Sequence, residues 1–463
     1  HDSKVILQCV RRACYARVLG RARRQNLGWL PGYSCSDVGM ASGWAAQQAR
    51  QLKTTLYMLF ADLSQFFPRV NRKCLRVAEL AHGIPKQVLA LAAAIYGSST
   101  DDPRVASCVY DSAGGFSDAF PNGMGVLMGC PLSTDRARLF LNSIVCAIEL
   151  TAKGIRLWGS NGARNKTAWR RVSQLMNADD WCGIFEDEAE LRKAWKLWAA
   201  WEPLTGAKVG IKAADKTVLT GVHYGADGRP SPVPDPCLRT VDGRQVPLRP
   251  PEYAYKHLGR WRRADGSVAR MLAEFRAAFN GALRRLRAMR GTATRYQFLL
   301  VSAALIGGAA DHYLQDTFIS FDEADALEAK WRRVFNSHVK RPTDTPRAEI
   351  YEHKWQAGRT RRHLYSHGLV ALYSAVNNAL ADVADLDHRA LARSGLALSM
   401  YKWGCRGDPL LWNWDHLEQR LLDALRHKHD RFYGDAWLYA VIQLRKPRAS
   451  ADGDGDDAVE DAD

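Results

Sequence analysis

The pattern of apolar positions places a buried strand ahead of two helices in the N-terminal part of the chain. Residues 54–61 form a nearly continuous apolar run with many β-favouring side chains, which predicts a central strand that ends at Asp62. Helical periodicity follows over residues 72–82 and 86–96. The Gly and Pro of segment 83–85 break the pattern between these two helices.

A hairpin is predicted in the middle of the chain. Residues 172–178 and 181–185 favour strands, and Asp179-Asp180 joins them. Asp187 and Glu190 then resemble a capping box at the start of a helix. One face of that helix carries apolar side chains at helical spacing, namely Leu191, Trp195 and Trp198. The order strand, helices, hairpin, helix predicts an α+β fold in which helices back an antiparallel sheet.

The C-terminal half is predicted to be mostly helical. After a Pro-rich segment at 228–251, residues 270–290 carry an apolar stripe on one helical face. The stripe consists of Leu272, Phe275, Phe279, Leu283 and Leu286. Arg276, Arg284 and Arg287 occupy the other faces and form either an ordinary solvated face or a nucleic-acid contact. Residues 346–447 have a helical pattern without a motif, and the acidic segment 448–463 is expected to be disordered.

The chain is basic, and its charge is unevenly distributed. The formal net charge is +16, although residues 452–463 contain seven acids and no base, so the rest of the chain carries 16 + 7 = +23. An excess of this size indicates a polyanionic partner, while a merely soluble basic protein is the alternative. A length of 463 residues, with 47% hydrophobic and 25% charged residues, indicates several globular domains.

Cysteine usage and hydropathy indicate an intracellular protein. The ten cysteines include no Cys-x-x-Cys pair and no zinc-ligand spacing, so reduced thiols are expected. The longest apolar runs, 88–96 and 299–310, are shorter than the roughly 20 residues that cross a bilayer, so neither a membrane span nor a signal peptide is expected. The chain begins at His1 without Met, which suggests that an upstream segment is missing.

Asp62 and the pair Asp179-Asp180 form the strongest candidate for a catalytic site. Both lie where an apolar strand ends, and pairing of these strands would bring the carboxylates to one edge of the sheet. Phosphoryl transfer uses such a cluster to hold two Mg²⁺ ions about 3.5 to 4 Å apart. Mg²⁺ prefers hard oxygen ligands, so two or three aspartates suffice. Because an Asp-Asp pair is also common in ordinary turns, the order of further motifs decides between the two interpretations.

Six short segments carry a resemblance to a known family. Three of them are Ala61-Asp62-Leu63-Ser64-Gln65-Phe66-Phe67, Met128-Gly129-Cys130-Pro131-Leu132-Ser133 and Asn177-Ala178-Asp179-Asp180. The others are Gly206-Ala207-Lys208-Val209 with Lys216-Thr217, Tyr255-Lys256-His257-Leu258-Gly259 and, upstream, Leu27-Gly28-Trp29-Leu30-Pro31-Gly32. In this order they resemble motifs of the reverse transcriptases of retrotransposons that lack long terminal repeats (LINE-type). The resemblance covers about residues 1–345.

The resemblance implies the catalytic residues. Asp62, Asp179 and Asp180 would be metal ligands, with Asp62 and Asp179 as the main pair, since adjacent side chains of a strand point in opposite directions. Lys216 would stabilise or protonate the leaving pyrophosphate. The implied cofactor is a pair of Mg²⁺ ions, with Mn²⁺ as a substitute.

The same family implies residues that contact the nucleotide and the primer. Phe67 would block a ribose 2′-hydroxyl by its bulk, and an ordinary core Phe is the alternative. Three further residues would shape the nucleotide-binding site, or else form a tight structural turn: Met128, Gly129 and Pro131. The primer grip would consist of Lys256, His257, Leu258 and Gly259.

The implied architecture is that of a right-hand polymerase. Its parts would be partial fingers (1–50), a palm (51–250), a helical thumb (251–345), a helical C-terminal region of unknown role (346–447) and the disordered tail (448–463). The implied function is that of an RNA-directed DNA polymerase, a nucleotidyltransferase. Its partners would be an RNA template, a DNA primer or target, and deoxynucleoside triphosphates, and its location the nucleus. The oligomeric state is not predicted.

Several departures from the family pattern leave a second function open. Met128 stands where the family has Gln, Asn177 where it has an aromatic residue, and Pro68 where it often has an acid. The fingers motif with Arg-Pro-Ile is absent and would lie upstream of His1. The alternative is therefore a catalytically degenerate relative that binds RNA without polymerising. A viral RNA polymerase, which usually has Gly-Asp-Asp, and an intron maturase are less favoured.

Overall fold

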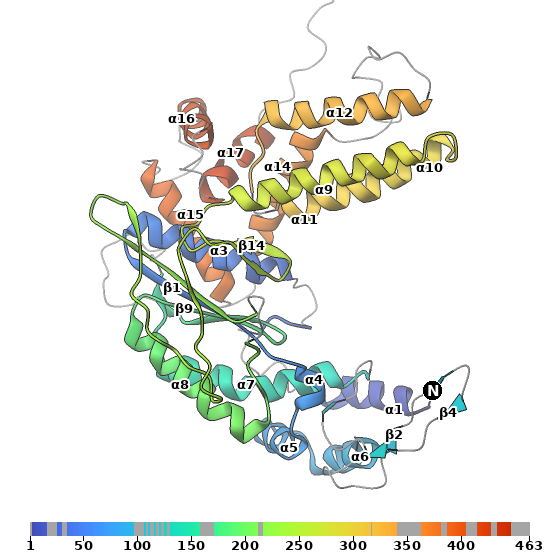
Figure 1. Cartoon of the computed structure of the whole chain (residues 1–463), viewed down its shortest axis with the longest axis vertical. Coiled ribbons are helices and arrows are strands. Elements are labelled where there is room, and N and C mark those ends of the chain that lie inside the picture. Colours follow the sequence, from blue (N-terminus) through green and yellow to red (C-terminus); the bar gives the residue numbers. More distant parts are fainter. Residues whose placement is uncertain are drawn as a thin grey trace, which may run out of the picture.

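The chain folds around a sheet that is covered by helices on both faces (Figure 1). This computed structural model describes residues 2–15, 26–29, 35–96, 106–107, 110–111, 115–116, 120–121, 125–126, 130–157, 171–211, 216–315, 317–339, 363–380, 387–403, 414–426 and 433–445. The strand order is β11-β10-β1-β9-β8, with β12 beside β10. These strands are β1 (Thr55–Asp62), β8 (Gln174–Asn177), β9 (Asp180–Phe185), β10 (Val218–Tyr224), β11 (Pro230–Pro232) and β12 (Leu248–Arg249).

β1 is the central strand and pairs antiparallel with β9 on one side and β10 on the other. The predicted buried strand at 54–61 is thus confirmed, and Asp62 is its last residue. The predicted hairpin is also confirmed, since β8 and β9 pair antiparallel. The predicted strand 172–178 is interrupted at Ser173, because β7 (Arg171–Val172) pairs with β6 (Ile155–Arg156) instead of continuing into β8.

The first face of the sheet packs against α7 (Ser133–Thr151) and α8 (Glu188–Thr205), as Figure 1 shows. Side chains of β1 that point to this face join a core with Trp198 and other aromatic residues of both helices. The predicted N-cap of α8 is confirmed, since the Asp187 carboxylate accepts hydrogen bonds from the backbone of Ala189 and Glu190. Only half of the predicted capping box forms, because the Glu190 carboxylate accepts from the Lys153 N–H instead.

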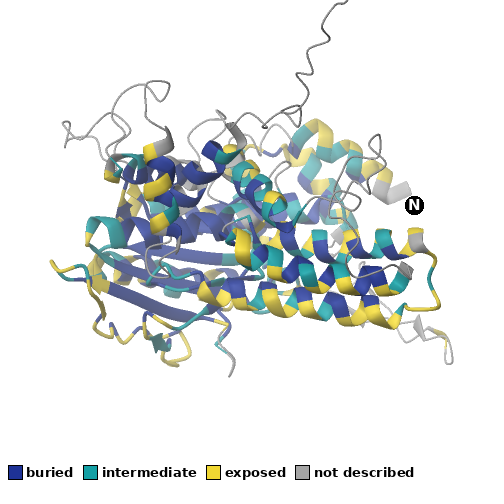
Figure 2. Ribbon diagram, turned by 90° about the horizontal axis from the view of Figure 1, so that it is seen from above, coloured by how far each residue is buried: buried dark blue, intermediate teal, exposed yellow. Residues whose placement is uncertain are grey.

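The second face packs against α3 (Cys35–Leu52). Four C-terminal helices join the same core, with α15 against α3: α14 (Leu364–Leu380), α15 (Asp387–Lys402), α16 (Trp414–Arg426) and α17 (Tyr433–Arg445). Met58 and Phe60 of β1 share this core with Trp44 of α3 and Leu391 of α15. Successive side chains of a strand point to opposite faces, so a strand covered on both faces is apolar throughout. Figure 2 shows the resulting buried layers between helices whose outer faces are exposed. The described helices of the region 346–447 therefore complete the core.

Two groups of helices extend from the sheet on the same side and give the molecule a concave face (Figure 1). The lower arm contains α1 (Asp2–Val10), η1 (Arg11–Tyr15), α4 (Phe66–Arg69), α5 (Arg72–Ala81) and α6 (Lys86–Tyr96), together with the short strands β2 (Ala106–Ser107), β3 (Tyr110–Asp111), β4 (Gly115–Phe116) and β5 (Phe120–Pro121). The buried Glu79 carboxylate of α5 connects this arm to α7, because it accepts from the Tyr15 hydroxyl of η1 and from the Arg136 guanidinium of α7. Both helices predicted at 72–82 and 86–96 are confirmed.

The upper arm contains α9 (Ala269–Ala288), α10 (Arg295–Ser302), η2 (Ala303–Gly307), α11 (Gly308–Tyr313) and α12 (Phe321–Val339). All five members of the predicted apolar stripe of α9 are buried in its core. The hairpin of β13 (Tyr255–His257) and β14 (Arg260–Arg262) leads from the sheet into this arm. In the described part of the chain, no helix combines the length and the apolar character that crossing a membrane requires.

The contact between α15 and α3 gives a prediction for stability. A Cβ atom at Gly395 would lie 2.0 Å from the Trp44 ring, so Gly395→Ala should lower the free energy of unfolding by about 1–3 kcal/mol through overpacking. Gly281→Ala in α9 is the matched control, because nothing lies within 4 Å of the added methyl group there. The control should raise stability by up to about 1 kcal/mol through helix propensity. Urea unfolding measures the free energy of unfolding of both variants. Equal changes in the two variants would contradict the close packing of Gly395 against Trp44.

Candidate catalytic carboxylate site

Pairing of β1 with β9 brings the predicted carboxylates together. Asp62 and Asp180 are direct partners in the antiparallel register, and Asp179 lies in the turn that connects β8 to β9. Directly opposite residues have Cα atoms about 4.5–5.5 Å apart and side chains on the same face of the sheet. The register thus places Asp180 opposite Asp62, whereas the family resemblance ranks Asp179 first. That ranking stays a prediction.

The three carboxylates impose unfavourable charge on one another. Burial is the main cause that raises the pKa of Asp180, and together with the negative charges of Asp179 and Asp62 it brings this pKa to about 7. The pKa of Asp179 is also raised, first by burial, while a backbone hydrogen bond opposes the shift and the charge of Asp62 adds to it. Carboxylates that are half-desolvated and close together favour protonation or a bound cation.

Lys216 places a positive charge beside this cluster. Its Nζ atom is 3.2 Å from Oδ1 of Asp62. The Lys216 side chain is 57% exposed and that of Asp62 is 19% exposed. An ion pair with so much solvent exposure contributes about 1 kcal/mol or less, so Lys216 is able to leave Asp62 at little cost.

Backbone contacts fix the segment that leads to Lys216. The Ser64 N–H donates to the Lys208 carbonyl and the Gly210 N–H donates to the Asp62 carbonyl, each at 2.8 Å. Gly210 leaves no room for a side chain, because a Cβ atom would lie 2.5 Å from the Ser64 hydroxyl oxygen. The predicted fourth motif therefore lies directly against the end of β1.

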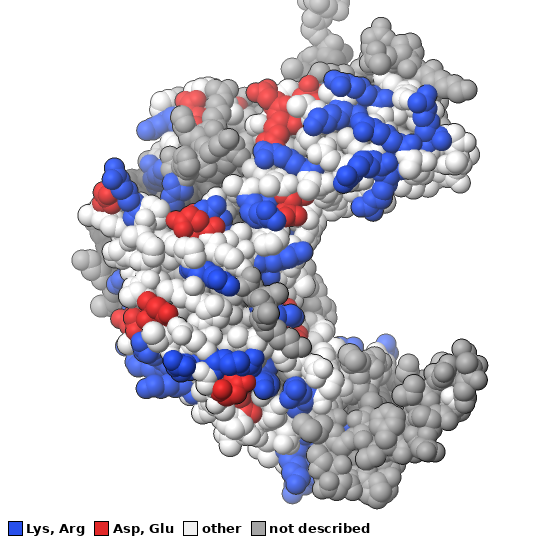
Figure 3. Space-filling view, viewed as in Figure 1, with Lys and Arg blue, Asp and Glu red and all other residues white. Residues whose placement is uncertain are grey.

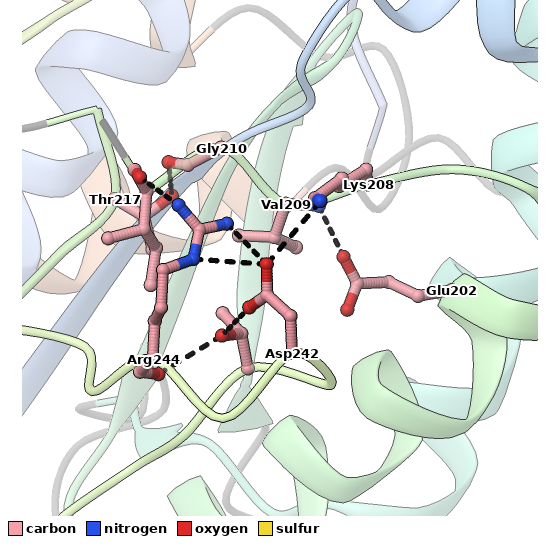
Figure 4. Close-up of polar contacts among 9 residues, drawn as sticks. Glu202, Lys208, Val209, Gly210, Thr217, Asp242 and Arg244 are labelled. Carbon is pink, nitrogen blue, oxygen red and sulfur yellow. Dashed lines mark hydrogen bonds and ion pairs between the residues drawn. The ribbon is translucent and has the colours of Figure 1, made fainter.

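A polar network holds the same segment from its outer side (Figure 4). Asp242 forms ion pairs with Arg244 at 2.7 Å and with Lys208 at 3.4 Å. The Arg244 contact, the Thr240 hydroxyl and Lys208 hold the pKa of Asp242 well below its usual value. Arg244 also donates to the Ile211 carbonyl, and Glu202 accepts from the Val209 N–H. The segment held in this way is joined to the residue after Lys216, because the Thr217 hydroxyl donates to the Gly210 carbonyl at 2.8 Å.

The donors at this site fit Mg²⁺ in their chemistry. Carboxylate oxygens are the ligands that Mg²⁺ prefers. Burial and then the neighbouring carboxylates raise the pKa values of Asp179 and Asp180, and a cation would favour their charged forms. In the described ranges, however, no three His, Cys, Asp or Glu side chains are close enough together to hold a metal ion in their present positions. Side-chain rotation at the turn is needed before all three aspartates share an ion.

The predicted primer-grip residues form the β13–β14 hairpin. Leu258 and Gly259 both have positive φ angles, 51° and 79°, as a two-residue hairpin turn requires. Lys256 is exposed, but the His257 ring is buried 5.0 Å from the ring of Phe60. Tyr255 stacks on the same Phe60 at 4.5 Å. The hairpin is thereby packed against β1 two residues before Asp62.

The structure describes two of the four predicted nucleotide-binding residues. Met128 and Gly129 lie outside the described residues. Pro131 is half-buried immediately before α7, and Phe67 is half-buried with its ring 5.5 Å from that of Trp29. The Asn177 side chain, at the position of the family's aromatic residue, donates to the Cys35 thiol at 3.0 Å. A cavity of about 500 Å³ lies elsewhere, at the far end of β10 beside Tyr224.

Two contacts at the site were not predicted. The Tyr255 hydroxyl donates to the Lys216 carbonyl at 2.9 Å, and the Asn26 side chain is hydrogen-bonded to the backbone of Ala178. Tyr255 belongs to one of the sequence motifs, and Asn26 directly precedes another. Their places in or beside a motif were the feature of the sequence that could have indicated a role at the site. Neither contact follows from periodicity, because each joins residues that are far apart in the sequence.

Burial of His257 gives a prediction for the pH dependence of stability. Among the described residues neither ring nitrogen has a hydrogen-bond partner, and burial lowers the pKa of His257 to about 3. Below about pH 6.5 the unfolded chain takes up a proton that the folded protein does not, so stability falls by up to about 1.4 kcal/mol per pH unit.

We expect His257→Phe to reduce this acid dependence between pH 6.5 and pH 4, as measured by urea unfolding. Above pH 7.5 the imidazole is neutral in both states, so the slopes of the two proteins should coincide there. Identical slopes over the acid range would show that His257 is protonated in the folded protein.

Comparisons with known proteins do not assign the chain to a family. No family model and no curated protein matches its sequence. An apo telomerase of Candida tropicalis, truncated from its C-terminal domain, matches with a TM-score of 0.33 and 17% identity over 48% of this chain and 41% of that chain. Telomerase of Candida albicans, solved with a fragment of telomeric RNA, matches with a TM-score of 0.33 and 12% identity over 92% of this chain and 56% of that chain. The chain thus spans about half the length of these structures, and similarity at this level carries no argument about function.

Proposed function

We propose that the protein is an RNA-directed DNA polymerase of the retrotransposon type. The observation that carries the proposal is the pairing of Asp62 with Asp180 across β1 and β9, with Asp179 in the adjoining turn. The order of the sequence motifs around these residues supports it. In this proposal the sheet with α7 and α8 is the palm and the upper arm is the thumb. The lower arm belongs to the fingers, although its residues 66–121 fall in the range that the sequence assigned to the palm.

The residues of the site suit nucleotidyl transfer. Two Mg²⁺ ions held by Asp62, Asp179 and Asp180 would activate the primer hydroxyl and neutralise the triphosphate. The oxygen of the primer 3′-hydroxyl forms a bond to the α-phosphorus, its proton passes to solvent, and the bond to pyrophosphate breaks. Lys216 releases Asp62 and donates a proton or a hydrogen bond to the departing pyrophosphate. Its exposed ammonium group is mobile enough for this movement.

The distribution of charge supports a nucleic-acid partner. Figure 3 shows Lys and Arg side chains gathered on the upper arm, over α9 and α12. Exposed arginines on α9 include Arg284, Arg285 and Arg287, and the exposed Arg290 follows the helix. Arg276 instead forms an ion pair with Glu323 of α12 at 2.6 Å. Of the three arginines singled out in the sequence, Arg284 and Arg287 are thus the better candidates for phosphate contacts.

A second candidate function is RNA binding without polymerisation. It is favoured by the lack of a ready three-ligand metal group among the described residues and by the ion pair that engages Asp62. Wild-type protein that binds RNA in a salt-sensitive manner but incorporates no nucleotide in Mg²⁺ would select this function. Counterion release makes such binding weaken with salt by about 0.7 logarithmic units per neutralised phosphate for single strands.

Replacing one carboxylate tests the polymerase assignment. Asp179→Asn should reduce primer extension on an RNA template by at least about 100-fold, because a lost ligand removes several kcal/mol of charge stabilisation. Template affinity should stay near that of the wild type. Asp187→Asn is the matched control: it makes the same change at the N-cap of α8, where Asn also caps a helix, and should keep full activity. Undiminished extension by Asp179→Asn would overturn the proposal.

The raised pKa of Asp180 predicts that metal binding depends on pH. Below about pH 7 the Asp180 carboxyl is protonated in the metal-free protein, and the proton must leave before the oxygen binds a cation. Mn²⁺ affinity, measured by electron paramagnetic resonance, should therefore fall by up to about tenfold per pH unit below pH 7 and level off above it. Asp180→Asn should show a shallower dependence. A pH-independent affinity in the wild type would contradict the raised pKa.

A further inference from the structure

We propose that Asn26 is a positioning residue that fixes the turn carrying Asp179 and Asp180. This inference rests on the proposed function, because it gives Asn26 a role in aiming the carboxylates. Asn26 lies in the described segment 26–29, far from the hairpin in sequence, and the residue is 2% exposed.

The Asn26 carboxamide bonds both polar groups of one peptide residue in the turn. Its oxygen accepts from the Ala178 N–H at 3.0 Å, and its nitrogen donates to the Ala178 carbonyl at 3.0 Å. The same oxygen accepts from the Gly28 N–H at 2.9 Å, which holds the side chain in this orientation. The Leu27 N–H adds a bond to the Met176 carbonyl at 2.9 Å. Segment 26–29 is thus hydrogen-bonded both to strand β8 and to the turn that follows it.

The residue that Asn26 holds has an unfavourable backbone conformation. Ala178 has a φ angle of 60°, in the left-handed region that residues with a Cβ atom rarely adopt. Such a conformation persists only where the surroundings enforce it. The two hydrogen bonds to Asn26 supply that enforcement one residue before Asp179, so they set the direction in which both carboxylates leave the turn.

Gly28 allows the segment to come close enough for these bonds. A Cβ atom at Gly28 would lie 2.1 Å from the Ala178 nitrogen and 2.6 Å from its Cα atom, so even a methyl group would displace the turn. The requirement for Gly at 28 and Asn at 26 therefore has one cause, which is close packing against Ala178.

If Asn26 had a purely structural role, its replacement would lower stability without a specific effect on the carboxylate site. A buried Asn that only satisfies backbone groups would affect global stability in the same way as any other buried Asn. Asn142 of α7 is a buried Asn away from the turn: it is 7% exposed, and its Nδ2 atom lies 2.7 Å from the side-chain atom Nε2 of His82. Asn142→Ala is therefore the matched control.

The test compares Asn26→Ala, Gly28→Ala and Asn142→Ala in the full chain at pH 8. Mn²⁺ affinity by electron paramagnetic resonance and single-turnover primer extension should each fall by about tenfold or more in the first two variants. The KM for template should stay within about twofold of the wild type, because the turn does not hold the template. Asn142→Ala should lose stability but keep the wild-type Mn²⁺ affinity. Equal Mn²⁺ affinity in Asn26→Ala and the wild type would overturn the inference.

Hydrogen exchange separates failure of the inference from failure of the proposed function. Peptides that cover residues 177–182 should exchange faster in Asn26→Ala than in the wild type, while peptides from α8 stay unchanged. Wild-type protein that neither binds Mn²⁺ nor extends a primer would overturn the proposed function. Hydrogen exchange at the turn would still test whether the hydrogen bonds from Asn26 stabilise it. Unchanged exchange in Asn26→Ala would refute that stabilisation.

Discussion

The antiparallel pairing of β1 with β9 is the constraint on which the rest of the structure depends. Register decides which side chains share a face, so a shift of one residue would move Asp62 away from Asp180 and turn each buried β1 side chain toward the opposite core. Two cores prevent such a shift, since Leu59 packs with α7 and α8 while Phe60 packs with α3 and the C-terminal helices. The position of the carboxylates is therefore determined by apolar packing on both sides of the sheet.

Local patterns were sufficient to predict the elements of the sheet and much of the site. The apolar run before Asp62 required a buried strand, and the apolar segments on either side of Asp179-Asp180 required a hairpin. The α9 stripe followed from helical spacing alone. In each case the determining information lies within one stretch of sequence, where the period of the apolar positions reflects burial.

Contacts between distant segments were outside the reach of these patterns. The C-terminal helices gave no motif, yet Gly395 packs against Trp44 and closes the second core. His257 was predicted as a primer contact, but its ring is buried against Phe60 because β13 stacks on β1. The bonds from Asn26 to Ala178 are of the same kind. A polar residue looks the same in sequence whether it meets solvent, a partner or a distant backbone.

Several features of the carboxylate site oppose folding, so other interactions in the protein must offset their free-energy cost. A left-handed Ala178 costs about 1–3 kcal/mol, and two carboxylates with raised pKa values add electrostatic repulsion. The exposed ion pair of Lys216 with Asp62 is too weak to balance these terms. The stabilising free energy has to come from apolar packing on both faces of β1 and from the hydrogen bonds between Asn26 and the turn. A cation that binds only the folded arrangement would relieve the repulsion directly, so the carboxylate cluster should be the part of the fold that gains most from such binding.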